Sequence, residues 1–140
     1  MRVFAIAALS VFFFACRGSS EGNSEASGEE VKLKFKEVMA VHDEIMPKMR
    51  DIQNSTKALK QFVETGQLAE EEVTRVQSMI DSLEMAETTM MEWMHNFDAE
   101  RQGGEQASEK ITYLEGQRRD MVQIGKRTER ALEAAENYLK

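Results

Sequence analysis

Cysteine and proline are almost absent from this 140-residue chain, which has one of each, Cys16 and Pro47. A lone cysteine excludes an internal disulfide, so apolar burial has to stabilise the folded part. With one proline and no segment in which β-branched and polar residues alternate, the sequence argues against a sheet-rich fold. The chain also lacks the run of about 20 apolar residues that a membrane-spanning helix requires. Its net charge of −7 argues against nucleic-acid binding.

The start of the chain combines a basic residue, an apolar stretch over 3–14, a small residue and a cysteine, in that order. A basic start, a short apolar core and a small residue are typical of a secretory signal peptide. Because Cys16 follows directly after Ala15, the segment resembles the start of a bacterial lipoprotein. In such proteins a diacylglycerol is attached to the cysteine thiol and the chain is cut just before that residue.

This resemblance implies a signal peptide over 1–15, a lipidated Cys16 and a protein held at the cell envelope, with the outer membrane as the expected site and the periplasmic or outer surface as the expected face. Phe13 and Phe14 depart from the usual pattern, which has leucine three residues before the cysteine and a small residue at the next position. The alternative is an ordinary cleaved signal followed by an incidental cysteine. An unpaired cysteine in an exported chain favours lipidation.

Residues 17–30 consist almost wholly of serine, glycine, glutamate and asparagine. Such a segment buries too little apolar surface to offset the entropy of ordering, so we expect 16–30 to be a lipidated cysteine followed by a disordered linker. As a flexible coil it would span roughly 20 Å and hold the folded part away from the lipid.

Apolar side chains in residues 31–140 recur at alternating steps of three and four, the spacing of helices that pack along a common seam. The spacing predicts helices over about 31–64, 69–98 and 108–139, with a C-terminal glycine at Gly66. Short connections make neighbouring helices antiparallel. We therefore predict an all-α fold, an up-down-up antiparallel three-helix bundle with coiled-coil-like packing. The alternative is a helical hairpin that completes its core by dimerising.

Pro47 lies within the first predicted helix. It removes one backbone hydrogen bond, and its ring collides with the carbonyl of Asp43. Because the seam continues in register on both sides, at Ile45 and Met49, we expect a kinked helix at this point.

Three seam positions are polar: His42, Glu87 and Arg118. If the two turns centre near residues 66 and 103, these three side chains lie at nearly the same height in the bundle. We expect Glu87 and Arg118 to form a partly buried ion pair, with His42 as a third member. Such a layer either selects one alignment of the helices or forms a small binding site.

Methionine is abundant, and it clusters with both histidines of the chain. Thioether and imidazole groups are suitable ligands for Cu(I), so the clusters indicate a candidate copper site. The alternative interpretation is that the methionines fill irregular gaps in the core beside Trp93 and the proline. The candidate metal ligands are Met39, His42, Met46, Met90, Met94 and His95.

No pattern of nucleophile and base, metalloprotease motif or phosphate-binding glycine loop is present, so we predict that the chain is not an enzyme and needs no cofactor beyond the copper alternative. The basic residues of the third helix are the one place where an anionic partner would dock. They are Arg118, Arg119, Lys126, Arg127 and Arg130.

The segments VMAVHDEIMPKM (38–49) and MMEWMHNF (90–97) resemble a group of small helical lipoproteins of the Bacteroidota, many of which carry the label "viral A-type inclusion protein". This resemblance implies export and an all-helical domain, and it brings no activity, cofactor or catalytic residue with it. We therefore predict a lipid-anchored helical module that binds an envelope protein or has a structural role, with copper binding as the alternative function.

Overall fold

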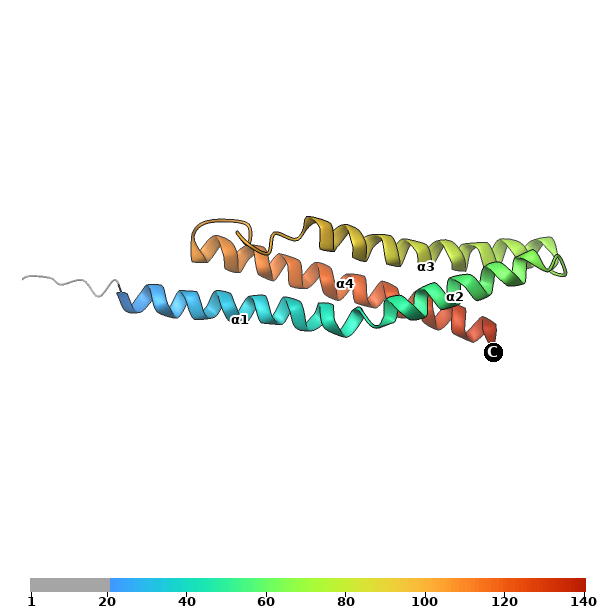
Figure 1. Cartoon of the computed structure of the whole chain (residues 1–140), viewed down its shortest axis with the longest axis horizontal. Coiled ribbons are helices and arrows are strands. Elements are labelled where there is room, and N and C mark those ends of the chain that lie inside the picture. The colour runs from blue at the N-terminus through green and yellow to red at the C-terminus, as the bar shows by residue number, and fades with distance from the viewer. Residues whose placement is uncertain (1–20) are drawn as a thin grey trace, which may run out of the picture.

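The computed structural model of the chain describes residues 21–140, which hold four α-helices and no strand. Helix α1 spans Glu21–Ile45, α2 spans Lys48–Glu64, α3 spans Glu70–Asn96 and α4 spans Ala107–Leu139. Figure 1 shows an elongated molecule in which α1 and α2 run in succession along one direction, α3 returns, and α4 runs forward again. The all-α prediction is confirmed. The described residues form a bundle of three packed legs: α1 followed by α2 is the first leg, α3 the second and α4 the third.

Helix α1 begins before the predicted start at residue 31. The segment from 21 to 30, predicted to be part of a disordered linker, continues the helix in the structure. Acidic side chains are favoured near a helix N-terminus by the positive end of the helix dipole. One turn of this segment is also closed by the ion pair between Lys32 and Glu29, with Nζ 2.7 Å from Oε1. The predicted signal peptide and Cys16 lie outside the described residues.

None of the helices in residues 21–140 combines the length and the apolar character needed to cross a membrane.

The first leg is broken at Met46 and Pro47, where the sequence predicts only a kink. Helix α1 ends at Ile45, and Pro47 occupies the N-cap position of α2. Proline has no N–H to donate, and its ring collides with the carbonyl four residues earlier, so α1 ends before it. The Arg50 N–H then donates to the Pro47 carbonyl at 3.3 Å. As a result α1 and α2 have different neighbours: α1 packs along α4, whereas α2 packs on both α3 and α4.

The core follows the predicted spacing of three and four residues. Fully buried side chains occupy the seam of every leg, among them Ile52, Leu83 and Met121. Gly125 is buried where α4 approaches α1, and a Cβ atom at this position would lie 2.9 Å from Cδ1 of Ile45. A side chain at this position would therefore require the buried Ile45 side chain to shift.

Aromatic rings fill the end of the bundle where α1, α3 and α4 meet. Phe97 is the centre of this cluster, with its ring centroid 4.7 Å from that of Trp93 and 6.0 Å from those of Phe35 and Tyr113. The Tyr113 hydroxyl accepts a hydrogen bond of 2.8 Å from the backbone N–H of Asp98. The rings from α3 thus reach α1 without direct backbone packing between those helices.

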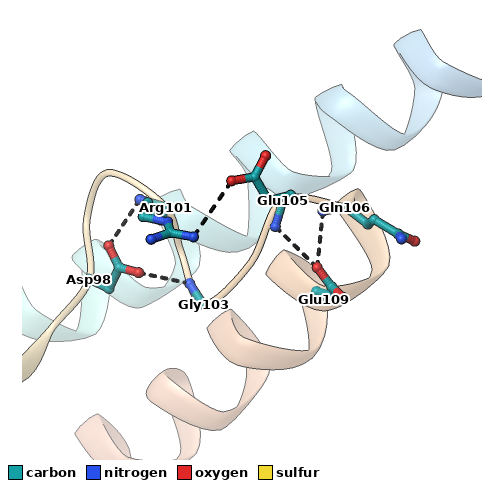
Figure 2. A network of polar contacts seen from close by, with 6 residues as sticks. All are labelled: Asp98, Arg101, Gly103, Glu105, Gln106 and Glu109. Carbon is teal, nitrogen blue, oxygen red and sulfur yellow. Dashed lines mark hydrogen bonds and ion pairs between the residues drawn. The ribbon is translucent and has the colours of Figure 1, made fainter.

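The connection from α3 to α4 is ordered by carboxylates that accept backbone hydrogen bonds (Figure 2). Asp98 accepts from the N–H of Arg101 at 2.9 Å and from that of Gly103 at 3.2 Å. These hydrogen bonds from Arg101 and Gly103 hold the pKa of Asp98 below its ordinary value. Glu109 accepts from the N–H of Gln106 at 3.1 Å, which caps the first turn of α4.

Candidate functional site

The structure does not bring the predicted polar layer together. Glu87 accepts a 2.7 Å hydrogen bond from Nε2 of Gln53, which places it on the α2–α3 seam. The Arg118 Nε lies 3.7 Å from Oε2 of Glu37, which places Arg118 on the α1–α4 seam. Within residues 21–140 no ion pair joins Glu87 to Arg118. The two side chains instead contact different neighbouring helices, Glu87 reaching α2 and Arg118 reaching α1.

His42, the third member of that layer, faces the aromatic cluster. Its ring centroid lies 5.9 Å from that of Trp93, and its Nδ1 lies 2.9 Å from Oδ1 of Asp43. The side chain is mostly buried, with 15% of its surface exposed. His42 is therefore a packed side chain of the α1–α3 interface with one polar partner at hydrogen-bonding distance.

The candidate copper ligands are distributed between core and surface. Met90 is completely buried, whereas Met46 and Met94 are partly buried against the core. His95 is exposed at the end of α3. Residues 21–140 contain no group of three or more His, Cys, Asp or Glu side chains arranged to hold a metal ion. Copper binding by the methionine thioethers, Met39 among them, and by the imidazole of His42 stays a prediction.

Cross-helix polar pairs connect α1 and α2 to their neighbours along the bundle. The Lys34 Nζ lies 3.1 Å from Oε1 of Glu115 across the α1–α4 seam. The Lys60 Nζ lies 2.7 Å from Oε1 of Glu84 across the α2–α3 seam. Hydrogen bonding to these glutamates raises the pKa of each lysine, so both pairs favour the charged forms.

The α2–α4 seam is connected in the same way. Lys48, in the first turn of α2, pairs with Glu129 of α4. The hydrogen bond from Lys48 holds the pKa of Glu129 below its ordinary value. The α1–α4, α2–α3 and α2–α4 seams therefore each have at least one charged pair between their helices.

The α3–α4 seam differs, because polar contacts between its helices occur only at the two ends. At one end the Tyr138 hydroxyl donates to Oε1 of Glu72 at 3.1 Å; at the other the Tyr113 hydroxyl accepts from the N–H of Asp98. Burial, together with the hydrogen bond to Glu72, raises the pKa of Tyr138. Between these two tyrosines, no ion pair or side-chain hydrogen bond joins α3 to α4 in the described part of the chain.

An open groove of roughly 700 Å³ lies along this unconnected stretch of the α3–α4 pair. A second hollow continues it toward the end of α3 and shares Thr89, Ile124 and Arg127 with it. We call the two together the α3–α4 groove. Its first part is lined by Ser78, Met79, Asp81, Ser82, Met85, Ala86, Thr89, Ile124, Arg127, Arg130, Ala131 and Ala134. Its second part adds Glu92, Trp93, Asn96, Gln117, Asp120 and Gln123.

Small side chains keep the first part of the groove open. On α3 the hydroxyl of Ser82 donates to the Ser78 carbonyl of its own helix, at 2.8 Å, and the hydroxyl of Thr89 donates to the Met85 carbonyl at 2.7 Å. These hydroxyls are thus satisfied without crossing to α4. Met85 lies on the rim with 63% of its surface exposed, so its apolar side chain is accessible to a partner.

Two of the predicted basic residues, Arg127 and Arg130, line this groove, whereas Arg118 does not. Neither Arg127 nor Arg130 forms an ion pair with a carboxylate of residues 21–140. The Arg130 Nε donates to the backbone carbonyl of Lys126, at 3.1 Å. The one carboxylate of the first part, Asp81, accepts from Nε2 of Gln77 at 2.9 Å. The groove therefore contains two arginine charges that no carboxylate in the described chain neutralises by direct contact.

The sequence indicated the basic residues but not the groove. A pattern of apolar spacing identifies the buried face of each helix. Small residues such as Ser78, Ser82 and Ala134 do not contribute to that pattern, so it does not reveal a groove that they line. A signal was nevertheless present: on α3 the positions Ser78, Ser82, Met85 and Thr89 repeat at helical spacing without a charge. This stripe lies beside the predicted seam, where bundle helices usually carry charged residues.

Comparison with known proteins shows no matching family model, no matching curated protein and no matching solved structure. The resemblance to small helical lipoproteins therefore stays a prediction.

Proposed function

We propose that this chain is a lipid-anchored, non-enzymatic helical module of the cell envelope that binds another envelope component through the α3–α4 groove. The anchor is supported by the order of residues at the start of the chain, with Cys16 directly after a small residue. The binding role is supported by the groove. No catalytic role is included, because the candidate polar residues belong to separate seams and do not converge.

The observation that carries the binding role is the unconnected α3–α4 seam. The chain is rich in charge of both signs, with 31% charged residues, and it pairs charges across its other long seams. Along the α3–α4 groove no charged pair within the described residues joins the two helices, and the α3 wall that faces Arg127 and Arg130 has one carboxylate, Asp81, among uncharged side chains. A concave surface with apolar walls and a few unpaired polar groups is a typical binding site.

The position of α1 determines how the bundle would be held at a membrane. Only five residue steps separate Cys16 from the first residue of α1, Glu21, and they span at most about 18 Å. In this proposal the end of the bundle that holds the aromatic cluster and the α3–α4 connection lies near the lipid. The turn between α2 and α3 lies at the far end (Figure 1). The groove then faces sideways, accessible to a partner beside the protein.

The lipid anchor is tested by mass spectrometry of the mature chain and by fractionation of envelopes. We expect the N-terminal peptide of the mature protein to begin at Cys16 and to carry a diacylglycerol, and we expect the protein in the membrane pellet. The variant Cys16→Ser should lose the modification and remain as an unprocessed precursor. The control Met85→Ala should behave as the wild type. A mature wild-type chain with a free thiol in the soluble fraction would contradict the anchor.

A further inference from the structure

We infer that the α3–α4 groove binds a single amphipathic helix of a partner protein, in one direction, with acidic side chains of that helix over Arg127 and Arg130. This inference rests on the proposed function, which it extends by naming the chemical class of the partner. It follows from the shape of the groove, from the distribution of charge along it and from the way the same two helices already bind α2.

The groove has the length of a helix of several turns. On α3 its lining extends from Ser78 to Asn96, which corresponds to about 27 Å at 1.5 Å per residue, or five helical turns. Small residues on both walls, among them Ser82, Ala86 and Ala134, allow a helix axis to approach to the 8–10 Å (roughly) at which helices pack. A small molecule would leave most of such a trough empty.

The chain itself shows that the α3–α4 pair accepts a helix. Helix α2 packs against both α3 and α4, with Ile52 and Leu59 fully buried in that interface. The α3–α4 groove lies along the same pair of helices but is not occupied by α1 or α2. A partner helix in it would complete a second three-helix arrangement that uses α3 and α4 as shared walls.

Charge differs between the two halves of the groove. Arg130 lines only the half toward the C-terminal end of α4, where the one acidic side chain, Asp81, accepts from Gln77, and Arg127 lies where the two halves meet. Glu92 and Asp120 line the other half, and neither forms an ion pair within residues 21–140. Charges of this kind determine which partner and which orientation is accepted, because like charges placed together are costly.

The charges also predict where the partner's own charged residues lie. Asp120 and Arg127 are seven residues apart on α4, which corresponds to about 10.5 Å along the helix. A partner helix that satisfies both halves therefore carries acidic residues near one end and basic residues about two turns away, beside an apolar stripe that contacts Met85. The opposite direction would place like charges together, which is unfavourable.

A second copy of this chain suits the groove less well. For the basic half of one copy to meet the acidic half of the other, the two bundles must lie antiparallel, and this separates their N-termini. The separation approaches the length of α4, about 50 Å for 33 residues. Both N-termini must reach one membrane if Cys16 is lipidated, and five residue steps, at most about 18 Å, are available.

The test uses two synthetic helical peptides of about 18 residues without tryptophan. Both have the same apolar stripe; one carries Glu near its C-terminal end and Lys two turns earlier, and the other has these charges exchanged. A third and a fourth peptide repeat the two in reversed sequence order, so that both helix directions are sampled. Binding to the full chain in amphipol is measured by polarisation of a labelled peptide and by the emission of Trp93, which lines the groove.

We expect one charge arrangement to bind the wild type at least tenfold more tightly than its charge-exchanged partner. The double variant R127E/R130E should weaken that peptide at least tenfold and should strengthen the charge-exchanged one. The matched control R119E/K126E makes the same change in net charge on α4 outside the groove, and it should change the affinity less than twofold.

Three results would overturn the inference. One is that none of the four peptides binds with a dissociation constant below about 1 mM. The second is an equal loss of binding in R127E/R130E and in the control. The third is a concentration-dependent dimer of the wild type that R127E/R130E abolishes, which would assign the groove to a second copy. None of these readouts depends on the modification of Cys16, so failure of the anchor and failure of the groove are distinguishable.

Discussion

Glycine has opposite consequences at two positions of α4. At Gly125 a Cβ atom would lie 2.9 Å from Cδ1 and 3.2 Å from Cγ1 of Ile45, which is itself buried in the core. At Gly116 the nearest neighbour of such a Cβ would be the Arg119 guanidinium, at 3.8 Å. Helical glycine costs conformational entropy at both positions, but only at Gly125 would an added Cβ collide with a buried side chain.

Replacement of these glycines should therefore change stability in opposite directions. We expect Gly125→Leu to destabilise the fold by about 1–3 kcal/mol, because the added side chain overfills the contact with α1. Gly116→Ala should stabilise it by roughly 0.5–1 kcal/mol through the entropy of the unfolded chain. The free energies come from urea unfolding followed by circular dichroism. A neutral Gly125→Leu would mean that α1 does not pack closely on α4.

Single residues were predictable where burial determines them and unpredictable where a partner does. The spacing of three and four identified Val38, Ile45 and Leu83 as core residues, because a helix in a bundle has one apolar face. The same spacing could not tell that Glu87 bonds to Gln53 and Arg118 to Glu37. Such contacts depend on which helix lies opposite, and a seam pattern does not specify that.

At the scale of elements, the ionised carboxylate of Asp98 helps to hold the α3–α4 connection. The hydrogen bonds from Arg101 and Gly103 lower the pKa of Asp98 from its ordinary 3.8. A carboxyl group whose pKa is lower in the folded state contributes stability above its unfolded pKa. That contribution is lost as the pH falls through the lowered folded value.

The variant Asp98→Ala should consequently remove part of the acid sensitivity of the protein. We expect its thermal midpoint to be lower than that of the wild type at pH 6, and the difference between the two to shrink below pH 4. The measurement is circular dichroism melting between pH 2 and pH 6 (about one scan per half unit). Glu100→Ala, an exposed change in the same connection, is the control. A difference that is constant with pH would contradict the role given to the ionised carboxylate.

Helix boundaries were less predictable than helix existence. Three legs followed from the apolar spacing, but the break at Pro47 did not, because the seam continues in register across it. An apolar spacing that continues in register on both sides of Pro47 is compatible with one bent helix or with two separate helices. The early start of α1 at Glu21 also escaped the sequence, since a segment of Ser, Gly and Glu has no apolar face to reveal a helix.

At the scale of the whole molecule, the proposal joins an anchored N-terminus to a groove along the side of the bundle. The bundle fold followed from the sequence, whereas the groove required the structure, because it is formed by small residues and unpaired arginines on two different helices. If Cys16 carries the proposed anchor, only five residue steps separate the lipid from the first residue of α1. The groove would then contact its partner at a fixed distance from the membrane.

The most direct measurement of this account is photo-crosslinking in intact cells, with p-benzoylphenylalanine in place of Met85 on the rim of the groove. The same residue in place of Thr88, which is exposed on α3 and does not line the groove, is the positional control. We predict one discrete crosslinked product from position 85 and none from position 88. That product should disappear in R127E/R130E and persist in R119E/K126E. Equal crosslinking from both positions, or a product from position 85 that survives R127E/R130E, would contradict the account.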